Sequence, residues 1–183
     1  MRPTIVEPAA VHDTALVELK QWLGITRPHE DDLLTSLLHS GLATCEAFIG
    51  QTPIAQRVEE RVSPSRGDHY LSARPVRSFV SAQLLAPDGA VSPLDPVLFE
   101  HRIGPDGTAS IGLKEDVEGE AVLVRQEVGI AADWDSAPPA LKQGIVRLCA
   151  FEYRQRESTD GNERAPPASI TVLWRSWRTM RLA

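Results

Sequence analysis

The stretch HEDDLLTSLLHSGLATCEAFIGQTP, residues 29–53, is where the chain passes from a helical to an extended pattern. Acidic residues 30–32 crowd its start, where carboxylates complement the positive end of a helix dipole. Apolar side chains follow at helical spacing, namely Leu34, Leu37, Leu38, Cys45 and Phe48. Gly50 is a suitable C-cap, and Pro53 prevents the helix from continuing. The stretch therefore predicts one helix about 30 Å long, followed by a different kind of structure.

A shorter helix precedes this one. Asp13 and Thr14 offer N-cap oxygens, and a helically spaced apolar row ends where Gly24 stops the pattern. That row consists of Leu16, Leu19 and Leu23. Because only a short turn separates the two helices, we expect an antiparallel helical hairpin.

The middle of the chain has the pattern of short strands. Two Pro-Asp-Gly tripeptides, at 87–89 and 105–107, are strong turn signals of the same type. The expected strands are 54–62, 69–72, 78–85, 97–103, 109–113 and 121–130. Their close spacing predicts a small antiparallel sheet, sandwich or barrel inserted between helical segments.

Helical spacing returns after Ser136, and Pro138 and Pro139 are tolerated in a first turn. The predicted fold class is therefore α+β, with a helical bundle formed by the N- and C-terminal helices, an inserted antiparallel β domain and an extended or helical C-terminal docking tail. The expected divisions are 1–52 for the helical hairpin, 53–131 for the β insert, 132–157 for the third helix, and 158–183 for the linker and tail.

The C-terminal stretch PPASITVLWRSWRTMRLA, residues 166–183, combines tryptophans and arginines at helical spacing. Two hypotheses account for it. Aromatic and arginine side chains are common anchors of protein interfaces, so the tail is expected to dock onto a partner. The alternative is a terminal helix that closes the core of its own chain. In the docking hypothesis the preceding polar linker, from Arg154 to Arg164, leaves the tail disordered until a partner folds it.

The charge distribution bears on the kind of partner. All 25 acids and 15 of the 19 lysines and arginines lie in residues 1–163, whereas residues 164–183 carry four arginines and no acid. An acidic body with a basic tip is poorly suited to coating DNA and better suited to an acidic protein groove. A DNA-packaging or nucleic-acid-binding accessory protein that uses the Arg/Trp tail remains the alternative. No apolar run is long enough to span a bilayer and no signal peptide is evident, so we expect no membrane partner and a cytosolic protein.

No arrangement of residues predicts catalysis, a metal site or a cofactor. The polar cluster from His29 to Asp32 lacks metal-ligand spacing, and its place at a helix start explains its acids. Asp68 and His69 near Ser63 and Ser65 have the residue types of a hydrolase triad but no nucleophile elbow. An enzyme or small-ligand module in the β insert is a third hypothesis, without a candidate site. The remaining expectations are buried thiols at Cys45 and Cys149, and packing roles for Trp22 and Trp134.

The order of these elements resembles a known family. The stretch ALVELKQWLGITRPHEDDLLTSLLHSGLATCEAFIGQTPIAQ, residues 15–56, looks like the start of head-tail connector, or adaptor, proteins of long-tailed phages. The stretches PPALKQGIVRLCAFEYRQRE (138–157) and PPASITVLWRSWRTMRL (166–182) are similar to the adaptor of alphaproteobacterial gene transfer agents, which are phage-like particles. The resemblance covers both helical ends and the middle only loosely.

The resemblance implies a structural protein with no enzymatic activity. Such an adaptor forms a ring of about twelve copies beneath the portal protein and joins the DNA-filled head to the next connector or tail-completion protein. It is assembled in the bacterial cytoplasm and then lies in the neck of the particle, where DNA passes through the ring without sequence-specific contact. The family's C-terminal segment reaches into the portal ring. The docking residues implied here are Leu173, Trp174, Arg175, Trp177, Arg178, Met180, Arg181 and Leu182.

Overall fold

The computed structural model describes residues 3–10, 13–156 and 167–179. The chain divides into two compact units, a β unit of residues 1–9 and 55–129 and a helical unit of residues 10–54 and 130–183. The predicted α+β class is therefore confirmed. Within the described ranges, no helix is both long enough and apolar enough to cross a membrane.

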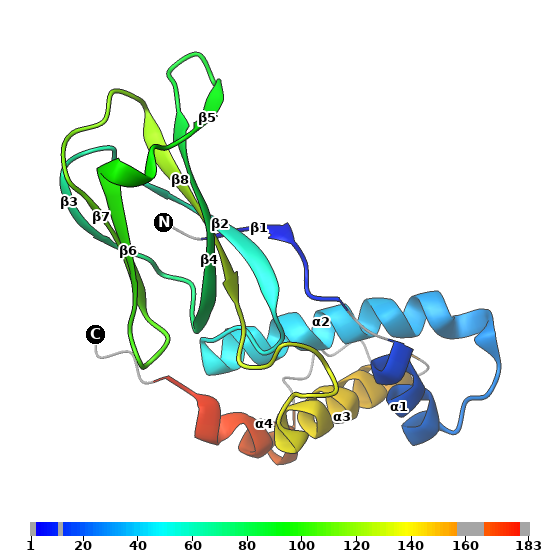
Figure 1. The fold of residues 1–183 in the computed structure, drawn as a ribbon. Coiled ribbons are helices and arrows are strands. Elements are labelled where there is room, and N and C mark those ends of the chain that lie inside the picture. The colour runs from blue at the N-terminus through cyan, green and yellow to red at the C-terminus, as the bar shows by residue number, and fades with distance from the viewer. Residues whose placement is uncertain (1–2, 11–12, 157–166, 180–183) are drawn as a thin grey trace. The chain divides into compact units, whose positions relative to one another are not determined.

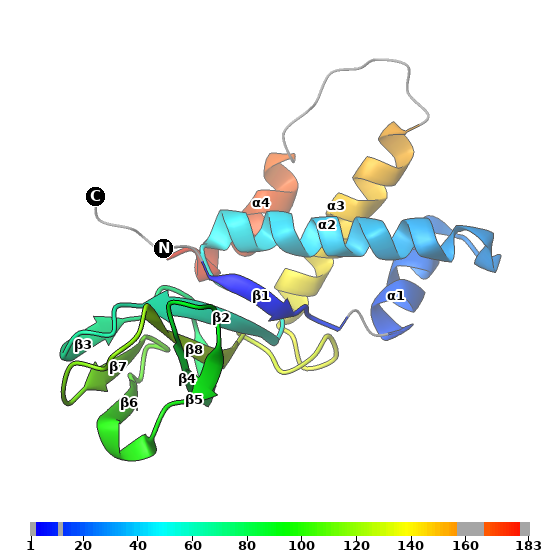
Figure 2. The same cartoon turned by 90° about the horizontal axis from the view of Figure 1, so that it is seen from above.

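The helical unit is built around one long helix, α2. Figure 1 shows α3 and α4 below α2, and Figure 2, seen from above, shows that both cross it. The elements are α1 (Asp13–Leu23), the short 3-10 helix η1 (Pro28–Glu30), α2 (Asp31–Ile49), α3 (Pro139–Gln155), α4 (Ala168–Trp174) and the 3-10 turn η3 (Arg175–Trp177).

The ends of α2 follow from local chemistry. Asp31 and Asp32 lie in its first turn, where they complement the helix dipole. Asp31 also accepts a hydrogen bond from Lys20 of α1 at 2.7 Å, which joins the two arms of the predicted hairpin. Gly50 ends the helix with a left-handed φ of 71°, a conformation that glycine adopts without steric cost. The C-cap predicted at this glycine is confirmed.

The core of the helical unit lies where α1, α3 and α4 meet α2. Buried side chains come from α1, α2, α3 and α4, and they include Ala15, Leu19, Leu34, Leu38, Cys45, Ile49, Leu141, Ile145, Leu148, Cys149, Ile170 and Trp174. Both cysteines are free and buried, as expected. Burial raises the pKa of each thiol to about 12, so neither is a reactive nucleophile at neutral pH.

Two glycines inside helices let these elements approach closely. A Cβ added at Gly41 of α2 would lie 2.7 Å from Sγ of Cys149 on α3. A Cβ added at Gly144 of α3 would overlap the indole Nε1 of Trp174 on α4. Each glycine therefore provides the space that a larger side chain on the facing helix occupies.

The β unit contains two antiparallel sheets. The five-stranded sheet has the order β1-β2-β8-β4-β5 and the three-stranded sheet has the order β3-β7-β6. The strands are β1 (Thr4–Glu7), β2 (Gln56–Val62), β3 (Gly67–Tyr70), β4 (Val76–Leu85), β5 (Val91–Pro93), β6 (Phe99–Ile103), β7 (Ala109–Leu113) and β8 (Ala121–Val128). A short 3-10 helix, η2 (Pro96–Leu98), precedes β6.

Both predicted Pro-Asp-Gly turns are present. Gly89 and Gly107 have φ values of 87° and 75°, and each closes a turn between neighbouring strands. In both turns the aspartate accepts a hydrogen bond from the backbone N–H two residues later, at 2.9 Å from Ala90 and 3.2 Å from Thr108. The two tripeptides form similar hairpin turns because the same three residues supply the same conformations.

One apolar core joins the two sheets of the β unit. Its buried members come from β2, β4, β7, β8 and their connections, and they are Val58, Leu71, Ala73, Val76, Ala82, Leu94, Ala109, Ile111, Leu113, Val122, Val124 and Val128. The rings of Phe79 on β4 and Phe99 on β6 lie 5.7 Å apart, so aromatic packing also connects the sheets. The β unit is thus a small sandwich, one of the architectures that the strand spacing predicted.

The N-terminal residues differ from the expected division of the chain. Residues 1–52 were assigned to the helical hairpin, but Thr4–Glu7 form β1 and pair antiparallel with β2. This strand is only four residues long and lies between Pro3 and Pro8, so its sequence gives little strand signal. The three-residue β5 was missed for the same reason of length.

A C-terminal surface on the helical unit

The sequence predicts a docking site in the C-terminal segment. In the structure, this segment starts with α4, whose last residue is packed into the helical unit. Trp174 at the end of α4 is fully buried. Its ring lies beside Gly144 and 5.9 Å from the ring of Phe48 on α2, and its Nε1–H donates a hydrogen bond to the carbonyl of Leu141 at 3.3 Å. Ile170, one turn earlier, is also buried. For α4, the structure therefore shows the alternative in which the terminal helix closes the core of its own chain.

After Trp174 the chain continues across the C-terminal end of α2. The carbonyl of Ile49, which cannot be bonded inside α2, accepts hydrogen bonds from the backbone N–H of Thr179 at 3.0 Å and from its hydroxyl at 3.2 Å. The amide Nε2 of Gln51 donates to the carbonyl of Trp177 at 2.6 Å. We call these contacts the clamp. The clamp holds η3 and the residues around it on the end of α2.

The clamp leaves the cationic side chains of this segment in solvent. Arg175 and Arg178 are exposed, whereas Leu173 and Trp177 are half-buried. The guanidinium carbon of Arg178 lies 5.4 Å from the centre of the Phe48 ring, which orients this side chain along α2. Of the eight docking residues expected from the resemblance, two are thus exposed, two are half-buried, and Trp174 is buried. Met180, Arg181 and Leu182 lie outside the described residues.

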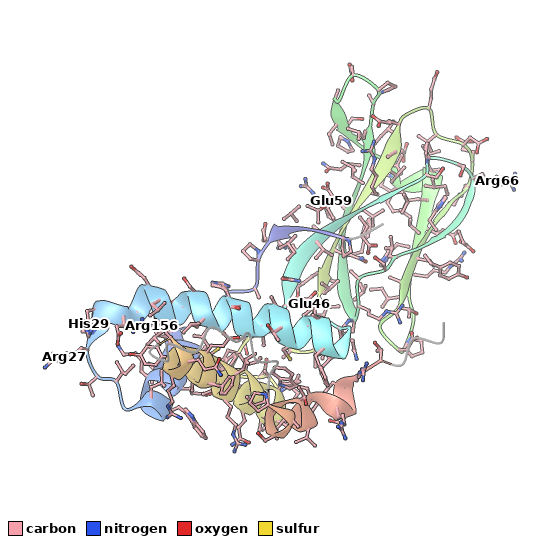
Figure 3. All side chains as sticks on the ribbon, turned by 180° about the vertical axis from the view of Figure 1, so that it is seen from behind. Arg27, His29, Glu46, Glu59, Arg66 and Arg156 are labelled. Atoms are coloured by element: carbon pink, nitrogen blue, oxygen red, sulfur yellow. The ribbon has the colours of Figure 1, made fainter. Side chains whose placement is uncertain are left out.

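The polar cluster at the start of α2 has a structural role. The carboxylate of Glu30 accepts a hydrogen bond from the hydroxyl of Tyr153 at 2.8 Å and lies 3.4 Å from a guanidinium nitrogen of Arg156, so it ties α3 to the start of α2. The hydrogen bond from Tyr153 is the main cause that lowers the pKa of Glu30. The hydrogen bond from Arg156 and the nearby positive charges lower this pKa further. Figure 3 shows His29 and Arg156 at this end of the helical unit and Glu46 towards the opposite end of α2. No group of three or more metal-ligating side chains occurs among the described residues.

The residues with hydrolase-triad types do not form a relay in the β unit. Asp68 pairs with Arg102 at 3.2 Å, while Nε2 of His69 contacts the backbone carbonyl of Ser65 at 2.8 Å.

The two tryptophans outside the tail differ from each other. Trp134 is 2% exposed and packs inside the helical unit, as expected. Trp22, which was expected to pack at the edge of the helical body, is 45% exposed. The guanidinium of Arg147 lies 5.5 Å from its ring, and the indole lines an open groove of about 520 Å³ between α1 and α3.

Sequence reasoning missed the residues that hold the C-terminal segment in place. Gln51 and Thr179 are ordinary polar residues in turns, and nothing in their spacing marks them as partners across the chain. Gly144 did carry a signal, because a glycine within a helix costs about 1 kcal/mol relative to alanine and usually has a packing reason. That reason is the indole of Trp174.

Comparison with known proteins gives a likeness of fold only. No protein-family model matches the chain, and no curated protein sequence matches it. Three solved structures contain chains with similar folds, and each comparison covers 100% of this chain and 98% of the other. They are the neck of an empty gene transfer agent particle computed with C6 symmetry (24% identity, TM-score 0.77), the virion of a native gene transfer agent particle (23%, 0.72), and the neck of a native particle computed with C12 symmetry (22%, 0.73). The predicted resemblance is thus confirmed at the level of the fold.

Proposed function

We propose that this chain is a structural protein of the neck of a phage-like particle. The observation that carries the proposal is the likeness of fold along the entire chain, through the β unit as well as both helical ends, to chains in gene transfer agent necks. A likeness limited to the helices would fit many helical proteins, whereas this combination of a helical unit with a β unit, formed by the N-terminal strand β1 and the inserted strands β2 to β8, is far more specific.

In the finer form of the proposal, the chain is a head-tail adaptor. About twelve copies form a ring beneath the portal protein and join the DNA-filled head to the next connector or tail-completion protein. The six-fold and twelve-fold symmetries of the similar necks support a repeated subunit. Contacts repeated around a ring add through effective concentration, so each docking site is individually weak while the attachment as a whole is firm.

In this proposal the docking surface consists of the exposed Arg175 and Arg178 and the half-buried Leu173 and Trp177. The docking residues expected at Met180, Arg181 and Leu182 lie outside the described residues. The chemistry of the docking surface suits an acidic groove, because the arginines are exposed and residues 164–183 carry no acid. Trp174 is assigned a different role, because a side chain buried in its own helical unit has no surface to offer a partner.

The test is electron microscopy of this protein co-expressed with the portal protein of its own gene cluster. Deleting the tail is a poor variant because it also removes Trp174 and Ile170 from the core. The double variant Arg175→Glu/Arg178→Glu instead reverses the charge of the surface while leaving both anchors in place. We expect rings on the portal with the natural chain and a loss of most rings with the double variant.

The matched control is Arg27→Glu, which reverses an exposed charge in the turn before α2 (Figure 3) and should leave the rings intact. Rings that persist with the double variant would contradict the docking surface. The absence of rings with the natural chain would contradict the adaptor role.

The alternative function, a DNA-packaging or nucleic-acid-binding accessory protein, rests on the same exposed arginines. It predicts DNA affinity that falls steeply with salt concentration and is lost in the Arg175→Glu/Arg178→Glu variant. A titration at low salt that shows no DNA binding would eliminate it.

A further inference from the structure

We infer that the C-terminal docking surface is positioned before its partner arrives, and that Gln51 and Trp174 are the residues that position it. This inference rests on the proposed docking function and goes beyond it, because it assigns roles to residues that do not touch the partner. It also replaces the sequence-based expectation that the tail stays disordered until it binds.

The first support is the anchor. Trp174 is 0% exposed, and its indole N–H is bonded to the carbonyl of Leu141 in the first turn of α3. Truncation of a buried tryptophan is among the most destabilising substitutions in a protein core, so this side chain is a strong anchor. Residue 174 is therefore fixed to the core of the helical unit, and Arg175 follows it directly along the chain.

The second support is the clamp, which fixes the chain again on both sides of Arg178. The carbonyl of Trp177 accepts a hydrogen bond from the side chain of Gln51, and the backbone N–H of Thr179 donates one to the carbonyl of Ile49. Arg175 and Arg178 therefore lie within a segment held at both ends, with only a few residues between the two attachments. Backbone freedom in this segment is largely lost before binding.

The physical consequence concerns affinity. Ordering a flexible segment at an interface costs free energy that is subtracted from the contacts it makes. A segment that is already ordered avoids this cost, so two arginines can bind an acidic surface more tightly than the same two on a free tail. Gln51 supplies part of this order through one hydrogen bond, whose net contribution is modest.

The test uses the full chain with the single variant Gln51→Met. Methionine retains the length of the side chain but has no N–H to donate to the carbonyl of Trp177. The matched control is Gln143→Met, at an exposed glutamine on α3. Three quantities are measured for each variant and for Arg175→Ala/Arg178→Ala: the amide hydrogen exchange of Arg178 and Thr179, the midpoint of thermal unfolding, and the affinity for purified portal rings.

If the surface is positioned in advance, the Thr179 amide of the free natural chain is protected from exchange. Gln51→Met should then increase exchange at Arg178 and Thr179 and weaken portal binding about fivefold, with an almost unchanged unfolding midpoint. Gln143→Met should change none of these quantities.

The other outcomes overturn the inference in distinguishable ways. An unprotected Thr179 amide in the natural chain, or unchanged exchange in Gln51→Met, shows that the segment is not held as inferred. In a second outcome, Gln51→Met exchanges faster but binds the portal as tightly as the natural chain, while Arg175→Ala/Arg178→Ala binds weakly. This outcome rejects the positioning role of Gln51 and retains the docking function. Unchanged affinity in both variants rejects the docking function itself.

Discussion

Glu60 shows how much a residue's role depends on partners far away in the sequence. Its carboxylate is buried in the β unit and accepts hydrogen bonds from the backbone N–H groups of Ser72 and Ala73, from the Ser72 hydroxyl and from the amide of Gln126. A buried carboxylate is tolerated when its oxygens are satisfied in this way. Glu60 therefore fixes the connection between the two sheets, although in the sequence it is one of three charged residues in a row.

His101 is the residue for which the structure predicts a pH dependence. Its ring lies 4.5 Å from the ring of Phe79 inside the β unit, its Nε2 is buried without a hydrogen-bond partner among the described residues, and burial lowers its pKa. The unfolded state therefore binds a proton on His101 more readily than the folded state does. The contribution of the neutral ring to the free energy of unfolding is fully present above the unfolded pKa of about 6.5. It is lost as the pH falls through the folded pKa.

The variant His101→Phe should therefore reduce the pH dependence of stability. We expect the free energy of unfolding of the natural chain to fall more between pH 7.5 and pH 5 than that of the variant, because phenylalanine keeps the ring contact and cannot be protonated. Urea unfolding at several pH values measures both curves. Parallel curves would show that His101 does not contribute to acid sensitivity.

At the scale of elements, the contact between α2 and α3 depends on Gly41. In an exposed helix Gly→Ala stabilises by about 1 kcal/mol. Here the added methyl group would lie 2.7 Å from Sγ of Cys149 and 3.3 Å from a methyl carbon of Ile145. We expect Gly41→Ala to destabilise the chain by about 1–3 kcal/mol, as measured by urea unfolding, because overpacking outweighs helix propensity.

Cys149→Ala removes the sulfur atom that the new methyl group would meet, so it serves as the second member of a double-mutant cycle. The double variant Gly41→Ala/Cys149→Ala should be more stable than the sum of the two single effects predicts. A stabilising Gly41→Ala variant, or strictly additive effects, would contradict a close contact at this position.

The elements that the sequence predicted well are those whose signals are local. The bounds of α1 and α2, the C-cap at Gly50 and both Pro-Asp-Gly turns depend on residues next to one another in the chain. The β1 strand could not be predicted in the same way, because Thr4 pairs with Glu59, 55 positions later. A strand of four residues is too short to show a clear alternation of apolar and polar side chains, and its own sequence does not indicate a pairing partner so far away.

The same distinction applies to the candidate surface. Its tryptophans and arginines were found from composition, since an acid-free terminus with two tryptophans is unusual. Which of Trp174 and Trp177 is buried was not predictable, because both lie in the same helically spaced apolar row and each is followed by an arginine. Only the glycine at position 144 and the end of α2 determine which of the two is buried.

At the scale of the whole molecule, the described surface does not resemble that of an obligate oligomer. Interfaces of permanent oligomers are large and hydrophobic, often above 2,000 Å². The exposed large apolar side chains of this chain are instead distributed over many separate elements, and they are Ile5, Val6, Val17, Trp22, Tyr70, Val80, Val91, Val97, Ile103 and Val172. The net charge of −6 also opposes self-association at low salt.

Under the proposed adaptor function, we therefore expect the free chain to be a monomer of 20.1 kDa and to form rings only on the portal. A head-to-tail contact closes into a ring only when its rotation is correct, and a symmetric template supplies that rotation while raising the local concentration of subunits. Light scattering coupled to size exclusion measures the mass of the free chain, and mass photometry of portal rings with increasing amounts of the chain measures its binding. The proposed ring predicts a steep, cooperative increase in bound mass, because each copy added to a ring contacts its neighbour. A stable ring without portal would show that the subunit contact alone sets the symmetry.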